Sequence, residues 1–313
     1  MASQGSKVLA SEYNALQSNV ATILGTGSGT LGYGQTLNSA QVTTTNKITA
    51  AQWTNLVTDI NNCVGHQGIT LSRAITSPSV GGKVYYDDSS TACYAAYSNA
   101  VSAIAVNPQV FPAAGQYSGT VLDNPTLTNM SWGTHTHTAT LTFGSADGFR
   151  YFFNSGGRIE ITPTIAGGGL SSSNTSTSID IAWQTIFNRM GTAYLTYNSS
   201  TVSNTNYTSG PNQSVTIASS VGAYQLTTSY QALVTSATPS GGTYYPNQYQ
   251  ITAKVNVTPN PTQILFSIIF SDSSYGTGAP TWAVTEPVDS TITDTISYTR
   301  ASGSYVSVAP PTL

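Results

Sequence analysis

Charged side chains are scarce in this chain of 313 residues. Asp, Glu, Lys and Arg make up 7 % of it, whereas an ordinary soluble domain has about 25 %. The nine Lys and Arg residues are scattered singly, so the chain lacks the basic patch by which proteins bind nucleic acid. A hydrophobic content of 39 %, together with regular alternation of polar and apolar residues, argues against a disordered chain.

Cysteines and long apolar runs are also few. Cys63 and Cys93 lie far apart, in segments expected to be helical, so free buried thiols are favoured over a disulfide. The first ten residues contain no apolar stretch long enough for a signal peptide. The longest apolar run, residues 264–270, is too short to span a bilayer. We therefore expect a protein that is made in the cytoplasm, is independent of membranes, and reaches the outside only by lysis or through a dedicated machine.

Ser, Thr, Asn, Gln and Gly take the place of the missing charges, and the chain has 19 tyrosines. A surface of neutral hydroxyls and amides is well solvated but repels no neighbour electrostatically. Such a surface suits a protein that works in an ordered assembly or outside the cell, where contacts are broad and permanent.

The first third of the chain is expected to be helical. Residues 7–25 and 47–65 align without gaps at an offset of 40 residues (47 − 7), and apolar residues recur in both at helical spacing. Their stripes begin with Tyr13, Leu16, Trp53 and Leu56. Thr49 and Gln52 form a capping-box pattern, and Gly25 and Gly65 stand where C-terminal glycines of helices belong. Residues 94–104 keep the spacing, so residues 1–110 are expected to form a helical module whose stripes pack together or against partner subunits.

Strand patterns dominate residues 111–313, with an alternative further division near residues 200–215. Alternating segments cover residues 132–143, 249–257 and 291–298, a helix is expected over 179–190, and residues 199–214 read as a surface loop. The predicted fold class is mainly β with a helical N-terminal module and an antiparallel β-sandwich or jelly-roll-like body.

Residues 148–161 are expected to form a β-hairpin at the centre of this body. A loop over residues 154–156 places Arg150 opposite Glu160 and Tyr151 opposite Ile159, which puts the opposite charges on one face. The same loop places Gly156 where such turns need a left-handed residue.

His135 and His137 are the candidate metal ligands. Both imidazoles project from one face of an alternating strand, and three such strands around the axis of a trimer would offer six nitrogens. The favoured alternative places both rings on a half-buried face, hydrogen-bonded to neighbouring hydroxyls and carbonyls, because no Cys, Asp or Glu nearby in sequence completes a site.

No pattern typical of an enzyme is present. The chain has no Gly-x-Ser-x-Gly elbow, and its carboxylates stand mostly at turns or helix starts, where Asp acts as a cap. Asp87 and Asp88, ahead of the third helical segment, are one example. A facing pair of carboxylates for glycoside hydrolysis stays an open alternative. We expect a non-enzymatic protein without a cofactor.

Tyrosines are the candidate binding residues of the body. Tyr244, Tyr245 and Tyr249 cluster beside a flexible segment, and tyrosine supplies contact area at low entropic cost. The alternative is that they fill strand faces.

Five segments carry a resemblance to a known family: "ASEYNALQ", "ITAAQWTNL", "FRYFFNSGGRIEI", "WQTIFNRMGTAYLTY" and "TISYTRASGSYVSVAPPTL". In these the chain resembles virion structural proteins of tailed phages, above all of contractile-tailed cyanophages, and the likeness spans essentially the whole chain. The resemblance implies a place in the particle, tail-fibre-like or at the neck, and brings no catalytic or ligand residue.

Composition and resemblance together predict a structural component of a virion, released by lysis. It is expected to contact other virion proteins and to form a homo-oligomer, with a trimer as the expected state. Two alternatives stay open: a capsid decoration protein, and a module that binds host surface polysaccharide through exposed tyrosines and Trp282.

Overall fold

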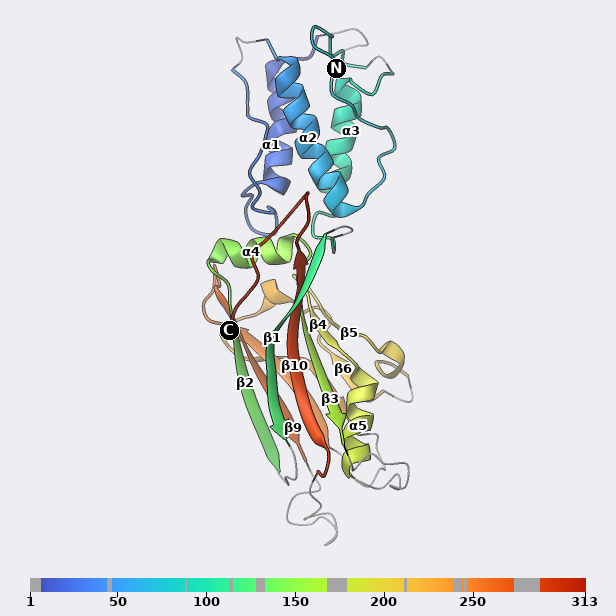
Figure 1. Cartoon of the computed structure of the whole chain (residues 1–313), viewed down its shortest axis with the longest axis vertical. Coiled ribbons are helices and arrows are strands. Elements are labelled where there is room, and N and C mark those ends of the chain that lie inside the picture. Colours follow the sequence, from blue (N-terminus) through green and yellow to red (C-terminus); the bar gives the residue numbers. More distant parts are fainter. Residues whose placement is uncertain are drawn as a thin grey trace. The chain divides into compact units, whose positions relative to one another are not determined.

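The structure, a computed structural model, divides into a helical unit and a β-sandwich unit (Figure 1). It describes residues 7–43, 47–87, 89–112, 115–127, 133–167, 179–210, 213–238, 244, 247–272 and 288–313. The first unit comprises Met1–Tyr117, Arg150–Gly157 and Arg300–Ala309, and the second comprises Ser118–Phe149, Arg158–Thr299 and Pro310–Leu313. The predicted boundary after residue 110 therefore lies near the observed one. The prediction did not include the two later segments of the first unit, Arg150–Gly157 and Arg300–Ala309.

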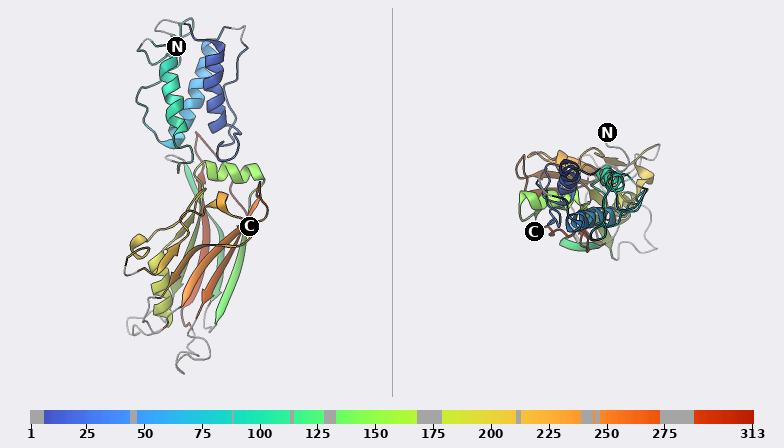
Figure 2. Two further views of the ribbon diagram at one scale, coloured as in Figure 1. Left: turned by 180° about the vertical axis from the view of Figure 1, so that it is seen from behind. Right: turned by 90° about the horizontal axis from the view of Figure 1, so that it is seen from above.

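Three helices form the first unit: α1 (Ala10–Leu24), α2 (Ala50–Gln67) and α3 (Tyr94–Ala105). They run side by side, as an end-on view shows (Figure 2). The capping box at the start of α2 is present, since Thr49 Oγ1 accepts from Gln52 N at 3.3 Å and Gln52 Oε1 accepts from Thr49 N at 2.7 Å. Among the described residues, no helix combines the length and the apolar character that crossing a membrane requires.

The apolar stripes of the three helices pack against one another. Tyr13 meets Trp53 edge-on with ring centroids 5.0 Å apart, and Trp53 stacks on Tyr97 at 5.1 Å. All three side chains are buried, as are Leu16 and Leu56. The first of the two sequence-based alternatives is the one observed: the stripes form the core of the module.

Gly65 does not end α2, contrary to the prediction. The helix continues to Gln67, and Gly68, with φ of 64°, supplies the left-handed C-terminal residue. A Cβ at Gly65 would lie 2.6 Å from the ring of Tyr305, so this glycine permits a close approach of the ring to the helix. Close packing, rather than helix termination, accounts for it.

Two five-stranded antiparallel sheets packed as a sandwich form the second unit, which confirms the predicted fold class. In sheet order, the first contains β1 (Gln116–Leu127), β10 (Thr291–Ala301), β3 (Arg158–Ala166), β4 (Ala193–Leu195) and β5 (Ser200–Val202). The second contains β2 (Thr134–Thr142), β9 (Gln263–Ser271), β8 (Gln248–Val255), β7 (Gln231–Ala237) and β6 (Val215–Ile217).

Alternation along the strands decides which faces meet. In β9, Ile264, Phe266, Ile268 and Phe270 are fully buried, while the residues between them are less buried. Helix α5 (Ile179–Met190), predicted with the same bounds, packs against β3, β7 and β8. It brings Trp183 to 5.8 Å from the ring of Phe270. The core therefore lies between the apolar sheet faces and the apolar side of α5.

The predicted hairpin over residues 148–161 is wrong in its first half, which is helix α4 (Ala146–Asn154). Ser145 Oγ accepts from Gly148 N at 2.9 Å, as an N-cap does. Phe149, Phe152 and Phe153 are all buried, at the i, i+3, i+4 spacing of a helix face. These local helix signals prevail over the strand propensity of the aromatic run.

Gly156 has the expected positive φ, 84°, but it ends a helix instead of turning a hairpin. Gly156 N bonds to Phe153 O at 3.1 Å and Gly157 N to Phe152 O at 2.9 Å, the two bonds of a Schellman motif. The predicted Arg150–Glu160 pair does not form. Arg150 donates to backbone carbonyls of residues 26–31, and Glu160 pairs with Arg158 at 2.7 Å.

The segment 199–214, predicted as a loop, contains more structure than expected. Its described residues include β5, which pairs with β4, and the short 3-10 helix Thr205–Tyr207. Ser200 is buried and donates to the carbonyl of Val221 at 2.6 Å. Tertiary pairing orders this segment, and its Ser- and Asn-rich composition gave no periodicity by which to predict it.

Replacement of Gly156 by alanine is expected to destabilise the chain more than replacement of Gly81. Both glycines have φ near 80° (84° and 79°), but a Cβ at Gly156 would lie 1.8 Å from the carbonyl oxygen of Val110, whereas Gly81 faces open space. The difference in unfolding free energy should be roughly 1–3 kcal/mol, the usual cost of overpacking. Chemical denaturation of the two variants measures it, and equal losses would contradict the described packing.

Candidate functional site

The two candidate metal ligands lie on β2 with their side chains turned into the sandwich. His135 and His137 pair with Phe270 and Ile268 of β9, and their rings lie 6.2 and 6.1 Å from the ring of Phe270. Thr136 between them and the neighbouring Thr134 and Thr138 face outward. The imidazoles are therefore on the half-buried face, which is where the favoured alternative placed them.

A carboxylate from the opposite sheet lies next to His137. Asp294 of β10 is fully buried, and its Oδ2 is 3.6 Å from His137 Nε2. Tyr249 of β8 donates its hydroxyl hydrogen bond to Asp294 Oδ1 at 2.7 Å. His137, Asp294 and Tyr249 thus form a polar cluster between the two sheets, which is called the inter-sheet cluster below.

Burial governs the protonation of the inter-sheet cluster. Desolvation raises the pKa of Asp294 to about 7, against the opposing effect of the Tyr249 hydrogen bond. Desolvation and the neighbouring His135 lower the pKa of His137 to about 4. Burial, with Asp294 adding to it, raises the pKa of Tyr249. Between about pH 4 and 7 the cluster is therefore neutral, as a low-dielectric interior favours.

The hydrogen bonds expected for the two histidines are not the ones observed. Both ring nitrogens of His137 and the Nε2 of His135 are buried without a hydrogen-bond partner among the described residues, and so is Asp294 Oδ2. The 3.6 Å separation of His137 and Asp294 is longer than a hydrogen bond. The rings pack on Phe270 in place of the predicted hydroxyls and carbonyls.

In the part of the chain that the structure describes, no three His, Cys, Asp or Glu side chains converge as metal ligands. His137 and Asp294 alone supply fewer protein ligands than either a structural or a catalytic zinc site has. Because both imidazoles face the sandwich interior, other subunits could reach them only at the edge of the sheet. Shared metal binding in a trimer stays a prediction.

The candidate interface residues are buried within the chain. Tyr13, Leu16, Trp53 and Leu56 belong to the core of the helical unit, and the hydroxyl of Tyr13 donates to the carbonyl of Gln52 at 3.1 Å. In the body, Tyr244 is 4 % exposed and Tyr249 is fully buried. Tyr245 lies outside the described residues. The described members of this set fill cores instead of lining a surface.

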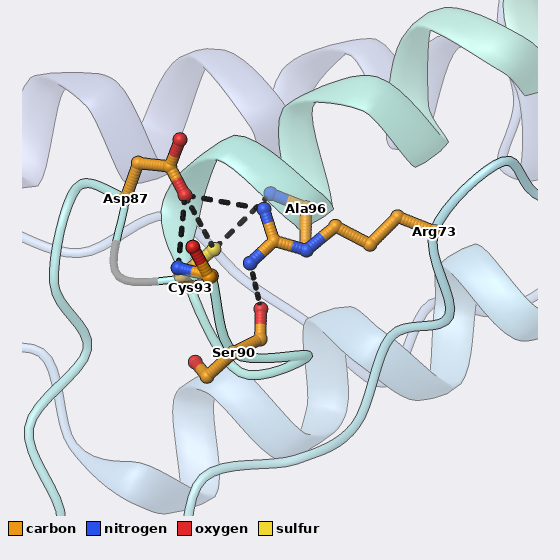
Figure 3. Close-up of polar contacts among 6 residues, drawn as sticks. Arg73, Asp87, Ser90, Cys93 and Ala96 are labelled. Carbon is orange, nitrogen blue, oxygen red and sulfur yellow. Dashed lines mark hydrogen bonds and ion pairs between the residues drawn. The ribbon is translucent and has the colours of Figure 1, made fainter.

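Asp87 does not cap α3 as predicted. The N-cap is Cys93, whose sulfur accepts from Ala96 N at 3.4 Å (Figure 3). Asp87 instead accepts from Arg73 Nη1 at 3.2 Å and lies 3.9 Å from Cys93 Sγ. Arg73 also donates to the carbonyl of Ser90. The cluster ties the loop before α3 to its first turn, while its half-exposed ion pair adds little stability.

Both cysteines are free and buried, as predicted. Cys63 lies in α2 and Cys93 at the start of α3. Burial, with Asp59 adding to it, raises the pKa of the Cys63 thiol above its ordinary range. A neutral, buried thiol behaves as a small apolar side chain, so Cys63 serves packing.

Other described carboxylates have structural partners. Both oxygens of the buried Asp59 accept hydrogen bonds from residues 38 and 39, at 2.7–3.1 Å. Asp180, in the first turn of α5, accepts from Ser290 N at 2.8 Å, and Glu160 accepts from Thr299 at 2.7 Å. Asp88 and Glu286 lie outside the described residues. These acidic groups hold loops and strands in place.

Asp294 is the residue of this site that the sequence interpretation missed. It is far from the histidines in sequence and belongs to the other sheet, so no local motif joins them. A signal was nevertheless present: along β10, Ile292, Asp294 and Ile296 share the buried phase of the alternation. An acidic residue at an apolar position of an alternating strand indicates a buried carboxyl group.

Comparisons of the chain with models of protein families, with curated proteins and with solved structures returned no match.

The inter-sheet cluster predicts a pH-dependent effect of Asp294→Asn. Because the pKa of Asp294 is raised from 3.8 to about 7 on folding, the folded chain keeps a proton that the unfolded chain loses in this window. The stabilisation by this group is complete below about pH 4 and disappears as the pH rises to about 7, a change on the order of 4 kcal/mol at about 1.4 kcal/mol per pKa unit. The Asp294→Asn variant has no titrating group at this position, so it does not lose this stabilisation as the pH rises.

Denaturation of both proteins from pH 4 to 8 measures the effect. The unfolding free energy of the variant minus that of the wild type should rise with pH up to about 7 and then level off. The lowered pKa of His66, near 4, is common to both proteins and cancels in the difference. A difference that is constant over this range would show that Asp294 is ionised in the fold. Tyr249→Phe, which removes the hydrogen bond to the carboxylate, should move the window to higher pH.

Proposed function

We propose that this chain is a non-enzymatic structural component of a phage virion, belonging to the tail, neck or fibre apparatus. It works there as a homo-oligomer, with a trimer as the expected state, in contact with other virion proteins. The observation that carries the proposal is the chemistry of the outward rows of β2 and β10, which consist of hydroxyl side chains in place of charges.

Threonine and serine occupy the outward positions of β2 and β10, one strand in each sheet. In β2, Thr134, Thr136 and Thr138 are exposed. In β10, the corresponding row is partly exposed and consists of Thr291, Thr293, Thr295 and Ser297. Surfaces that become buried between proteins are depleted of charge at their centres, because an unpaired charge is costly to desolvate. Rows of hydroxyl and methyl groups can be covered by neighbouring subunits without that cost.

The described ionisable groups support a structural role. Asp59, Asp180 and Glu160 hold backbone or neighbouring side chains, and the inter-sheet cluster is buried in the sandwich core. The resemblance of the five sequence segments to virion proteins of tailed phages supports the place that we propose. The alternative that the helical stripes pack against partner subunits loses its basis, because those stripes are covered within the module.

Gold labelling of intact particles with an antibody against this chain tests the proposed function. Label at the neck, tail or fibres is the expected result, and preincubation of the antibody with purified chain should abolish it. Label spread evenly over the head would replace the proposal by a capsid decoration protein. Absence of label from particles, with the chain detected in the lysate, would contradict a virion role. Binding of the chain to a host glycan array would favour the receptor alternative.

A further inference from the structure

The four edge strands of the sandwich differ in how they are protected against pairing with another chain. Edge strands expose a row of unpaired N–H and C=O groups, and proteins commonly blunt them with short lengths, prolines, charges or bulges. The edges β5 and β6 are three residues long. The edge β1 contains Asp123 and Pro125, residues that are depleted in strands.

The edge strand β2 has none of these devices. It runs for nine residues, Thr134–Thr142, and its sequence THTHTATLT contains no proline, Lys, Arg, Asp or Glu. Its register with β9 continues from Thr134 to Thr142 without a bulge. Figure 1 and Figure 2 show β2 at the side of the sandwich. Among the strands that the structure describes, this edge is the one open to a further strand.

The backbone of β2 identifies which residues face the open side. The N–H of Phe143 bonds to Thr262 on the β9 side, and the N–H and C=O of Thr142 point the other way and bond to Thr312, at 2.6 and 2.8 Å. Because successive residues of a strand alternate in direction, Thr134, Thr136, Thr138 and Thr140 also direct their N–H and C=O groups outward. No described residue pairs through its backbone with these four threonines.

We propose that the open edge of β2 pairs antiparallel with the same edge of a second copy of this chain. A two-fold axis beside His137 places Thr136 opposite Thr138 of the other copy and Thr134 opposite Thr140. All four outward-facing threonines of each copy then exchange N–H···O bonds, and the bridge between Thr142 and Thr312 stays intact. The β2-containing sheet of one copy and the same sheet of the other copy then become one continuous sheet across the axis.

A second copy fits this edge better than a foreign strand for a reason of symmetry. The outward row is a repeat of identical, uncharged residues, so the two-fold arrangement sets threonine against threonine and brings no like charges together. Threonine is β-branched and favoured in strands, and threonine pairs across strands form hydrogen bonds. An isologous interface of this kind is the commonest way in which identical chains associate.

The pairing specifies the symmetry of the assembly and goes beyond the proposed function. It predicts an even number of copies: a dimer if the edge acts alone, or a hexamer if it joins two trimers. It does not depend on a location in a virion, so a failure of the gold-labelling experiment and a failure of this pairing are separate results.

Charge-swap variants of the full chain test the pairing. Replacing Thr136 and Thr138 together by Lys, or together by Glu, puts like charges opposite each other and should raise the dissociation constant of the two-fold complex at least tenfold. Mixing the Lys variant with the Glu variant should restore association as a mixed pair. Thr201→Lys with Thr216→Lys, exposed threonines on the short edges β5 and β6, is the matched control and should associate as the wild type does.

Sedimentation velocity over a concentration series gives the assembly size, and hydrogen exchange gives the location. Amides of Thr134, Thr136, Thr138 and Thr140 should become protected in the associated wild type and lose protection in each charged variant. Three outcomes would overturn the proposal: a chain with no even-numbered state, association that the charges leave unchanged, or charged variants that dissociate but do not rescue each other. The last result would show that Thr136 and Thr138 do not face each other across the interface.

Discussion

The contact between the two apolar sheet faces is the interaction on which the β-sandwich depends. Phe270 lies at the centre of the part of the core between one sheet and helix α5: its ring is within 5.1 to 6.3 Å of the rings of Tyr249, Trp183, Phe187, His135 and His137. These residues come from three strands of one sheet and from helix α5. With a charge content of 7 %, the chain can draw little stability from ion pairs, so burial of apolar surface supplies the dominant favourable term.

The inter-sheet cluster interrupts this apolar contact with polar atoms. Tyr249 donates a hydrogen bond of 2.7 Å to Asp294 Oδ1, and His137 lies beside the second carboxylate oxygen, which has no hydrogen-bond partner among the described residues. A buried carboxyl group is tolerated where it can take up a proton, and the raised pKa of Asp294 expresses that preference. The cluster thereby couples the stability of the sandwich to pH, although the surface of the chain carries few titrating groups.

Hydroxyl groups replace charges in the outward rows of β2 and β10, with a consequence for assembly. Lysine and glutamate on strand edges normally keep sheets from joining, and a chain so poor in these residues needs other means. The short strands β5 and β6 and the proline of β1 provide them on three edges. The strand β2 is long and has no proline, charged residue or bulge. Their absence is consistent with an edge that pairs with a second copy in the normal assembly. The same scarcity of charge therefore connects the composition, the outer faces and the proposed interface.

Local sequence patterns were sufficient to predict the elements whose apolar residues recur with a clear helical or strand period. The helical spacing from Tyr13 and from Trp53, the bounds of α5 and the alternation of β2 followed from sequence, because each element presents one apolar face whatever it packs against. The sandwich followed from the number of alternating segments. The error at α4 arose where two local signals competed, since an aromatic run favours a strand while Ser145 and the spacing of its phenylalanines favour a helix.

Tertiary structure alone decided what the individual side chains do. Whether the helical stripes meet one another or a partner depends on the space that the other helices leave, and sequence periodicity is the same in both cases. The meeting of Asp294 with His137 depends on which strands face each other across the sandwich, because strand order joins residues that no motif connects. The open edge of β2 likewise follows from strand order. Sequence thus determined which residues are apolar and at what period, and the packing of the two sheets determined which polar groups became buried and which edge no other described strand covers.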